Sequence, residues 1–289
     1  MKKWLWLSSI VLSNPVLALN VVSSLKPIEM IVHEITGNKA TNDVIVSNQA
    51  SPHDFALKPS DITKIKQADA VIWYGEELEP FLEKPLSQRD NVLTISHLKT
   101  VDFIKFQEGE HHDDGHNHGN TDPHFWLGNQ PTQQVASEVA QFLSNMDPNN
   151  AQEYQANLAN FIQRLSEQKI KNTKQLDAVK DHGYYVFHDA YQYFERDYTL
   201  NKLGHFTVSP ERKPGAKTLI YIKNKLVSGD VKCVFTEPQF KPAIVKSVVS
   251  GTNVTIGQLD PLASEFKAEK GSYFSYIDSI ADSLSTCLR

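Results

Sequence analysis

The chain has 289 residues, of which 40% are hydrophobic and 22% are charged, as in a soluble globular protein. A formal net charge of -5 provides no basic field, which argues against nucleic acid as a partner. The length allows one large domain or two ordinary domains with real cores.

The first residues, "MKKWLWLSSIVLSNPVLALN", have the pattern of an export signal. Two lysines precede an apolar run that is too short to span a bilayer, and Val16-Leu17-Ala18 offers a cleavage site. No cysteine lies near this site, which argues against a lipid anchor. We therefore expect residues 1–18 to be a signal peptide and the mature protein to be exported and soluble.

Strand-like and helical stretches alternate after the signal. "LNVVSSL", "NDVIVSN", "ADAVIWYG" and "NVLTIS" are short and rich in β-branched residues, whereas 27–36 and 59–67 have helical patterns. Such alternation predicts a parallel sheet covered by helices, forming an N-terminal α/β lobe over 19–146. Within this lobe, residues 108–120 combine acidic residues and histidines with three glycines and no apolar residue, so we expect a flexible surface loop.

A long helix is predicted over 147–179, beginning at Asp147-Pro148 with a capping oxygen and a proline at the first helical position. No glycine or further proline interrupts this stretch before Val179. About 30 helical residues would measure about 45 Å, enough to brace two lobes rigidly. The strand-like runs "YYVFHD", "KCVFTEPQF" and "NVTIGQLD" then predict a C-terminal α/β lobe over 180–289, with helices between and after them.

The two cysteines, Cys233 and Cys287, form an even pair in a chain that we expect to be exported, which favours a disulfide. Helical spacing places Cys287 on the apolar face of the last helix, and Cys233 opens the strand-like run "CVF". Metal ligation is the alternative, but the spacing is wide and no histidine adjoins either cysteine.

Polar residues where strands end or turns begin are candidates for a binding site. They are His53, His124, His188 and Asp260. Ligands of open α/β sheets bind beyond the carboxyl ends of the strands, so lobes that face each other would bring these side chains into one cleft. Three imidazoles and a carboxylate suit a tetrahedral zinc site. A structural role is the alternative for each histidine, and His188 in particular could be a hydrogen-bonded core residue. Asp260 could be an ordinary turn residue.

Carboxylates next to two of these histidines, Asp54 and Asp189, are candidate hydrogen-bond acceptors for the rings, although adjacency alone does not establish a contact. Four further histidines lack a comparable setting and are interpreted as structural or surface residues: His33, His97, His182 and His205.

The segments "ASPHDFALKPSD", "TDPHFWL", "YYVFHDAYQYF", "CVFTEPQF" and "GQLDPL" together resemble the zinc-binding solute receptors of bacterial ABC importers. The resemblance extends over nearly all of 19–289. It implies a periplasmic, non-enzymatic and monomeric receptor that delivers Zn²⁺ to a membrane permease driven by a cytoplasmic ATPase, with an accessory periplasmic zinc carrier as a further partner. It also implies His53, His124 and His188 as ligands and supports the disulfide.

The resemblance leaves the fourth ligand open. Some zinc receptors have a carboxylate directly before the first histidine, but this chain has Pro52, which leaves Asp260 or water. The loop before the second ligand is another mark of zinc receptors. Its histidines would form a weak auxiliary site or bind metal only opportunistically. They are His111, His112, His116 and His118.

Three alternative functions remain from the sequence. A zinc hydrolase would use three histidines and an open position to activate water, but no H-E-x-x-H motif is present. A manganese or iron receptor would share the fold, although manganese receptors tend to have glutamate where this chain has His188. An adhesin or interaction protein is the third, and no particular surface in the sequence indicates it.

Overall fold

The computed structural model describes residues 18–46, 50–105, 121–208, 210 and 213–289. Most of the expected signal peptide and the histidines of 108–120 therefore lie outside the described residues. The strands are β1 Leu19–Ser23, β2 Ala40–Val44, β3 Ala70–Trp73, β4 Val92–Thr94, β5 Gly183–His188, β6 Lys202–Thr207, β7 Val231–Thr236 and β8 Thr255–Gln258. The α-helices are α1 Lys26–Thr36, α2 Pro59–Gln67, α3 Pro80–Leu86, α4 Asn129–Met146, α5 Ala151–Leu176, α6 Gln192–Tyr198, α7 Ala216–Val227, α8 Ala243–Val249 and α9 Ser272–Leu288.

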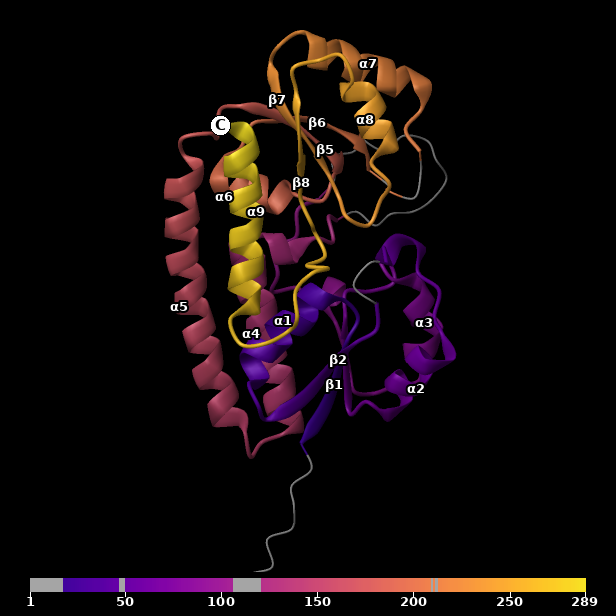
Figure 1. Ribbon diagram of the computed structural model, residues 1–289. Helices are drawn as coiled ribbons and strands as arrows, with labels where there is room; N and C mark the ends of the chain where they lie inside the picture. Colours follow the sequence, from indigo (N-terminus) through magenta and orange to yellow (C-terminus); the bar gives the residue numbers. More distant parts are fainter. Residues whose placement is uncertain (1–17, 47–49, 106–120, 209, 211–212) are drawn as a thin grey trace, which may run out of the picture.

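The strands form two sheets with the same topology. The first has the order β2-β1-β3-β4 and the second the order β6-β5-β7-β8, and each adjacent pair is parallel. In each lobe the chain crosses back over its first strand to reach the third, which creates a switch point where ligands bind in such sheets. The predicted fold class, two similar α/β lobes with parallel sheets, is confirmed (Figure 1).

Alternating side chains place each sheet between two cores. In β1, Val21 belongs to a central core, whereas Val22 faces a smaller core beneath α2 and α3. In β5, Val186 joins the same central core, and Tyr185 faces the core beneath α7 and α8. Residues that alternate along a strand point to opposite faces of the sheet. The central core therefore runs continuously from one lobe into the other.

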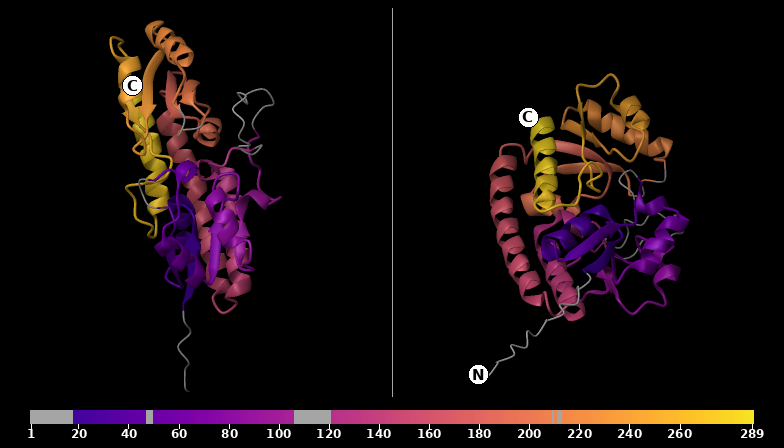
Figure 2. Two further views of the ribbon diagram at one scale, coloured as in Figure 1. Left: turned by 90° about the vertical axis from the view of Figure 1, so that its right-hand side faces the viewer. Right: turned by 60° about the horizontal axis from the view of Figure 1, so that its bottom comes forward.

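One long helix, α5, lies along both lobes, and α9 packs beside it (Figures 1 and 2). The 26 residues of α5 give this helix a length of about 39 Å. The predicted connecting helix is thus confirmed, but it begins at Ala151 and not at Asp147. Asp147 instead caps the C-terminus of α4, and its Oδ2 accepts hydrogen bonds from the side-chain amide of Asn150 and the hydroxyl of Tyr154. Pro148 lies in the turn between the two helices.

Strand β6 was not predicted from the sequence. Its polar residues and Gly204 lack the apolar alternation of a strand, because it is an edge strand and its burial is partial. Gly204 has a packing reason, since a Cβ atom at this position would lie 2.6 Å from the ring of Tyr185 on β5. Within the described part of the chain, no helix has the length and apolar character needed to cross a membrane.

Candidate metal centre

His53 lies in a 3₁₀ turn, Pro52–Asp54, in the segment that follows β2. Ser51 caps this turn, because its hydroxyl accepts a hydrogen bond from the backbone N–H of His53 at 3.3 Å. Pro52 is buried at the first position of the turn, where its fixed φ angle is compatible with helical geometry. The local sequence therefore sets the direction of the His53 side chain.

His124 directly precedes a 3₁₀ turn, Phe125–Leu127, whose residues are all buried. Asp122 orients it twice: Oδ1 accepts the backbone N–H of His124 at 3.0 Å and lies 2.7 Å from Nδ1 of its ring. Both side chains are buried, and that of Asp122 is fully inaccessible. With Nδ1 held in this way, Nε2 is the ring atom that remains for a ligand.

His188 is the last residue of β5, at the carboxyl end of the switch-point strand. Its ring is buried, and Nδ1 lies 3.8 Å from Oε2 of the equally buried Glu237, which follows β7. Burial lowers the pKa of His188, but the contact with the Glu237 carboxylate and its charge outweigh this effect, so that the net pKa is raised above its ordinary value.

The structure brings these three histidines together from both lobes. One nitrogen of each of His53, His124 and His188 lies within 4.8 Å of those of the other two. The ring centroids are 6.1 Å apart for His53 and His124, 5.2 Å for His53 and His188, and 5.0 Å for His124 and His188. In a tetrahedral zinc site, bonds of 2.0–2.1 Å place ligand atoms roughly 3.4 Å apart. Small ring movements would therefore let one ion contact all three.

Asp260 does not belong to this group. Its carboxylate closes the turn after β8, accepting hydrogen bonds from the backbone N–H groups of Leu262 at 3.0 Å and Ser264 at 2.5 Å. The amide of Gln239 also donates to it at 2.7 Å. This arrangement matches the turn role that was the alternative for Asp260, and its role as a fourth ligand stays a prediction.

The contacts of Asp189 differ from those expected from its position next to His188. Asp189 forms ion pairs with Lys202 and His205 and not with the adjacent His188. Asp122 contacts the ring of His124 and Glu237 contacts the ring of His188, and neither carboxylate was singled out from the sequence. The signal was available for both: Asp122 lies two residues before His124, and Glu237 lies at a strand end before Pro238, as the candidate ligands do.

The remaining described histidines lie outside the group. His97 is exposed and contacts Glu76, and Nδ1 of His182 lies 2.6 Å from the carbonyl oxygen of Leu288. His33 is part of α1, and His205 is part of β6.

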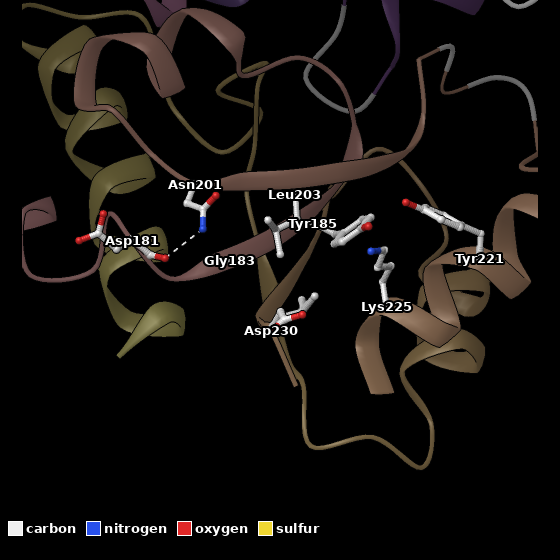
Figure 3. Close-up of a pocket in the computed structure, with 9 residues that line it drawn as sticks. Asp181, Gly183, Tyr185, Asn201, Leu203, Tyr221, Lys225 and Asp230 are labelled. Carbon is white, nitrogen blue, oxygen red and sulfur yellow. Dashed lines mark hydrogen bonds between the residues drawn. The ribbon is translucent and has the colours of Figure 1, made fainter. Parts of the chain in front are cut away.

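A separate hollow of about 460 Å³ lies in the C-terminal lobe (Figure 3). Gly183, Leu203 and Val231 at the amino ends of β5, β6 and β7 line it, with Tyr221 and Lys225 of α7. His188 is at the opposite end of β5. This hollow is therefore at the other edge of the sheet from the three histidines and is not part of the candidate metal centre.

The predicted disulfide between Cys233 and Cys287 is confirmed, and it joins β7 to α9. Cys233 is fully buried in the central core. The two cysteines are therefore not available as metal ligands, which excludes the alternative role that their sequence positions left open.

The chain is similar in sequence and in fold to known proteins. The family model described as "Zinc-uptake complex component A periplasmic" matches residues 21–287. The high-affinity zinc uptake system protein ZnuA of Yersinia pestis is 37% identical, over 100% of this chain and 98% of its own length. The ZnuA protein of Haemophilus ducreyi is 40% identical, over 93% of each chain. A crystal structure of ZnuA has the same fold, with a TM-score of 0.81 at 24% identity, covering 94% of this chain and 100% of that one.

Proposed function

The chain belongs to the family of the periplasmic component A of zinc-uptake systems, and from this premise we propose that it captures Zn²⁺ between its lobes and delivers it to an ABC permease. The family consists of solute-binding receptors and not of enzymes, so the ion is cargo and not a catalytic group. The hydrolase alternative is thereby set aside.

The observation that carries this proposal is the convergence of three imidazoles from segments far apart in the sequence. His53 and His124 come from the N-terminal lobe, and His188 comes from the C-terminal lobe. Groups supplied by two lobes suit a carrier, because one small displacement loosens several bonds together. We propose that these residues are the protein ligands and that water takes the fourth position, since the Asp260 carboxylate is engaged in its own turn.

The three imidazoles favour zinc over manganese. Imidazole suits zinc, whereas manganese prefers carboxylate, carbonyl and water oxygens. The manganese or iron receptor remains the second candidate because such receptors have the same fold. Competition between Zn²⁺ and Mn²⁺ at matched free concentrations separates the two, and preferential retention of Mn²⁺ would reject the zinc assignment.

Several further parts of the proposal concern cellular context. Residues 1–18 would direct export to the periplasm, where the lobes 19–146 and 180–289, joined through 147–179, would act as a monomer. The partners would be the membrane permease with its cytoplasmic ATPase and an accessory periplasmic zinc carrier. Sequencing of the mature N-terminus tests the removal of residues 1–18, and the mass in solution tests the monomeric state.

The histidines of 108–120 are proposed as an auxiliary, weaker zinc site. They are His111, His112, His116 and His118. Zinc titration of a protein lacking 108–120 tests this division: one tight site should survive the deletion. Loss of the tight site would show that these histidines belong to it.

The ligand assignment is tested by zinc titration against a competing chelator. Replacing His53, His124 or His188 with alanine should weaken the tight site by roughly 100-fold or more, since structural zinc sites owe 10–16 kcal/mol to about four ligands. His97→Ala is the matched control, because His97 is exposed and outside the group. An equal loss in the control, or none in the three variants, would reject the assignment.

A further inference from the structure

In two of the three grouped histidines, a buried carboxylate lies near Nδ1 of the ring. Oδ1 of Asp122 lies 2.7 Å from Nδ1 of His124, and Oε2 of Glu237 lies 3.8 Å from Nδ1 of His188. Asp122 is 0% exposed and Glu237 is 3% exposed. Each carboxylate therefore interacts with a ring from a position that solvent does not reach.

One short segment holds both carboxylate positions in place. The hydroxyl of Tyr191, three residues after His188, donates to Oε1 of Glu237 at 3.4 Å. The hydroxyl of Tyr193 donates to the backbone carbonyl of Asp122 at 2.8 Å and accepts the backbone N–H of Ile104 at 2.9 Å. Both tyrosines are buried at the start of α6. The second lobe thus positions a residue that orients His124 in the first lobe.

A dication among three neutral imidazoles would carry two uncompensated charges in a buried site. Such a charge is stable in a protein interior only when opposite charges lie close to it. Two buried carboxylates match the charge of one divalent cation. A carboxylate at Nδ1 also fixes the ring so that Nε2 faces the ion and makes that nitrogen a stronger ligand.

We propose that Asp122 and Glu237, anchored by Tyr193 and Tyr191, are positioning residues of the zinc site that fix the rings of His124 and His188 with Nε2 toward the ion and balance its charge. This inference rests on the proposed function and deepens it. It assigns the charge balance to carboxylates that do not touch the metal. It also makes α6 the element that couples the two lobes at the site.

The orientation part is tested on the zinc-free wild-type protein. Nitrogen-15 NMR of the imidazole rings at pH 8 should show the proton on Nδ1 in both His124 and His188. Asp122→Ala should lose this preference at His124, while Asp122→Asn, which keeps an acceptor oxygen, should retain it. Protons on Nε2 of both wild-type rings would overturn the orientation part directly, without any need for a variant that folds.

The charge part is tested by zinc titration of Asp122→Asn and Glu237→Gln. Each should weaken zinc binding by roughly 10- to 100-fold, the usual effect of losing a group that supports a metal ligand. Tyr193→Phe, which keeps the ring and removes the hydroxyl, should have a smaller effect in the same direction. Glu195→Gln is the matched control, because Glu195 is also buried but pairs with Lys202.

The outcomes separate this inference from the function on which it rests. If wild-type protein binds zinc tightly and the Asp122 and Glu237 variants bind within twofold of it, the inference fails and the proposed function stands. If wild-type protein has no tight zinc site, both fail together. Circular dichroism of each variant checks the fold. If a carboxylate variant does not fold, zinc titration of Tyr193→Phe and the NMR measurement on wild-type protein still test the inference.

Discussion

Trp126 donates its indole N–H to the carbonyl oxygen of Pro261 at 2.8 Å, and this buried hydrogen bond joins the segment that carries His124 to the turn that follows β8. The hydroxyl of Tyr276 on α9 donates to the same carbonyl at 2.8 Å, and the hydroxyl of Tyr273 donates to the carbonyl of Trp126 at 2.7 Å. The contact between the lobes is therefore hydrogen-bonded as well as apolar. Opening it would break these buried hydrogen bonds, each of which contributes about 0.5–1.5 kcal/mol net to stability.

Zinc binding should consequently cause little domain closure. We expect small-angle X-ray scattering to give the same radius of gyration, within error, for zinc-free and zinc-loaded protein. The continuous core and the long helix α5 hold the two lobes in a fixed arrangement, as the Trp126 hydrogen bond does. A clear compaction upon addition of zinc would show that the lobes move as hinged bodies.

Zinc affinity should fall as the pH is lowered. A histidine must lose its proton before it binds zinc. The raised pKa of His188 means that protonation stabilises the zinc-free fold, fully at pH values below the unfolded-state pKa and no longer once the pH exceeds the folded-state pKa. Protons therefore compete with zinc most strongly at low pH. Chelator competition from about pH 7.5 to about pH 5 should show a steady loss of affinity, and a flat profile would contradict a mainly histidine site.

The disulfide should contribute to stability and not to zinc binding. Replacing both Cys233 and Cys287 with serine removes a covalent loop closure and should lower the free energy of unfolding by roughly 4 kcal/mol in the loop-entropy model. Urea denaturation of the zinc-free protein measures this loss. Zinc affinity of the folded variant should be unchanged, so a large loss of affinity would indicate that the bridge also shapes the site.

Glu79, before α3, should make the stability of the zinc-free protein depend on pH. It is fully buried, and Oε2 accepts the backbone N–H of Tyr74 at 2.9 Å. Burial raises its pKa to about 7, although hydrogen bonds partly oppose this. A raised carboxyl pKa means that the folded state favours the neutral acid. Its contribution is complete below the unfolded-state pKa and is lost as the pH rises through about 7.

Glu79→Gln should therefore be more stable than wild type at pH 8, by at most roughly 3 kcal/mol, and no more stable near pH 4.5. Thermal or urea unfolding at both pH values measures the difference. Glu83→Gln is the control, because Glu83 lies on α3 and is exposed. An equal difference in stability between wild type and Glu79→Gln at both pH values would show that Glu79 does not titrate between pH 4.5 and pH 8.

The sequence predicts the parts of the fold that local chemistry determines. Apolar alternation locates the core strands, and α2 occupies the predicted range 59–67. The pattern misses β6, since an edge strand needs fewer apolar residues. It also places the start of α5 too early, because the Asp147-Pro148 cap signal serves the turn between two helices.

The sequence likewise predicts some parts of the candidate site and not others. Histidines at strand ends are visible in the sequence, and topology brings His53, His124 and His188 together. Their carboxylate partners also occupy recognisable positions, but the sequence does not show that Glu237, which follows β7, lies beside His188 across 49 residues of chain. Asp260 shares the strand-end position of the histidines, but its oxygens are close enough to the next backbone N–H groups to be satisfied locally. Sequence position identifies candidates, and three-dimensional contacts decide among them.

The central claim is that one ion is shared by imidazoles from both lobes. A crystal structure of protein loaded with one equivalent of zinc, with anomalous diffraction recorded at the zinc absorption edge, tests it most directly. The account predicts a single strong peak about 2.0–2.1 Å from one nitrogen each of His53, His124 and His188. A peak elsewhere in the molecule, with these three rings making no contact to it, would contradict the account.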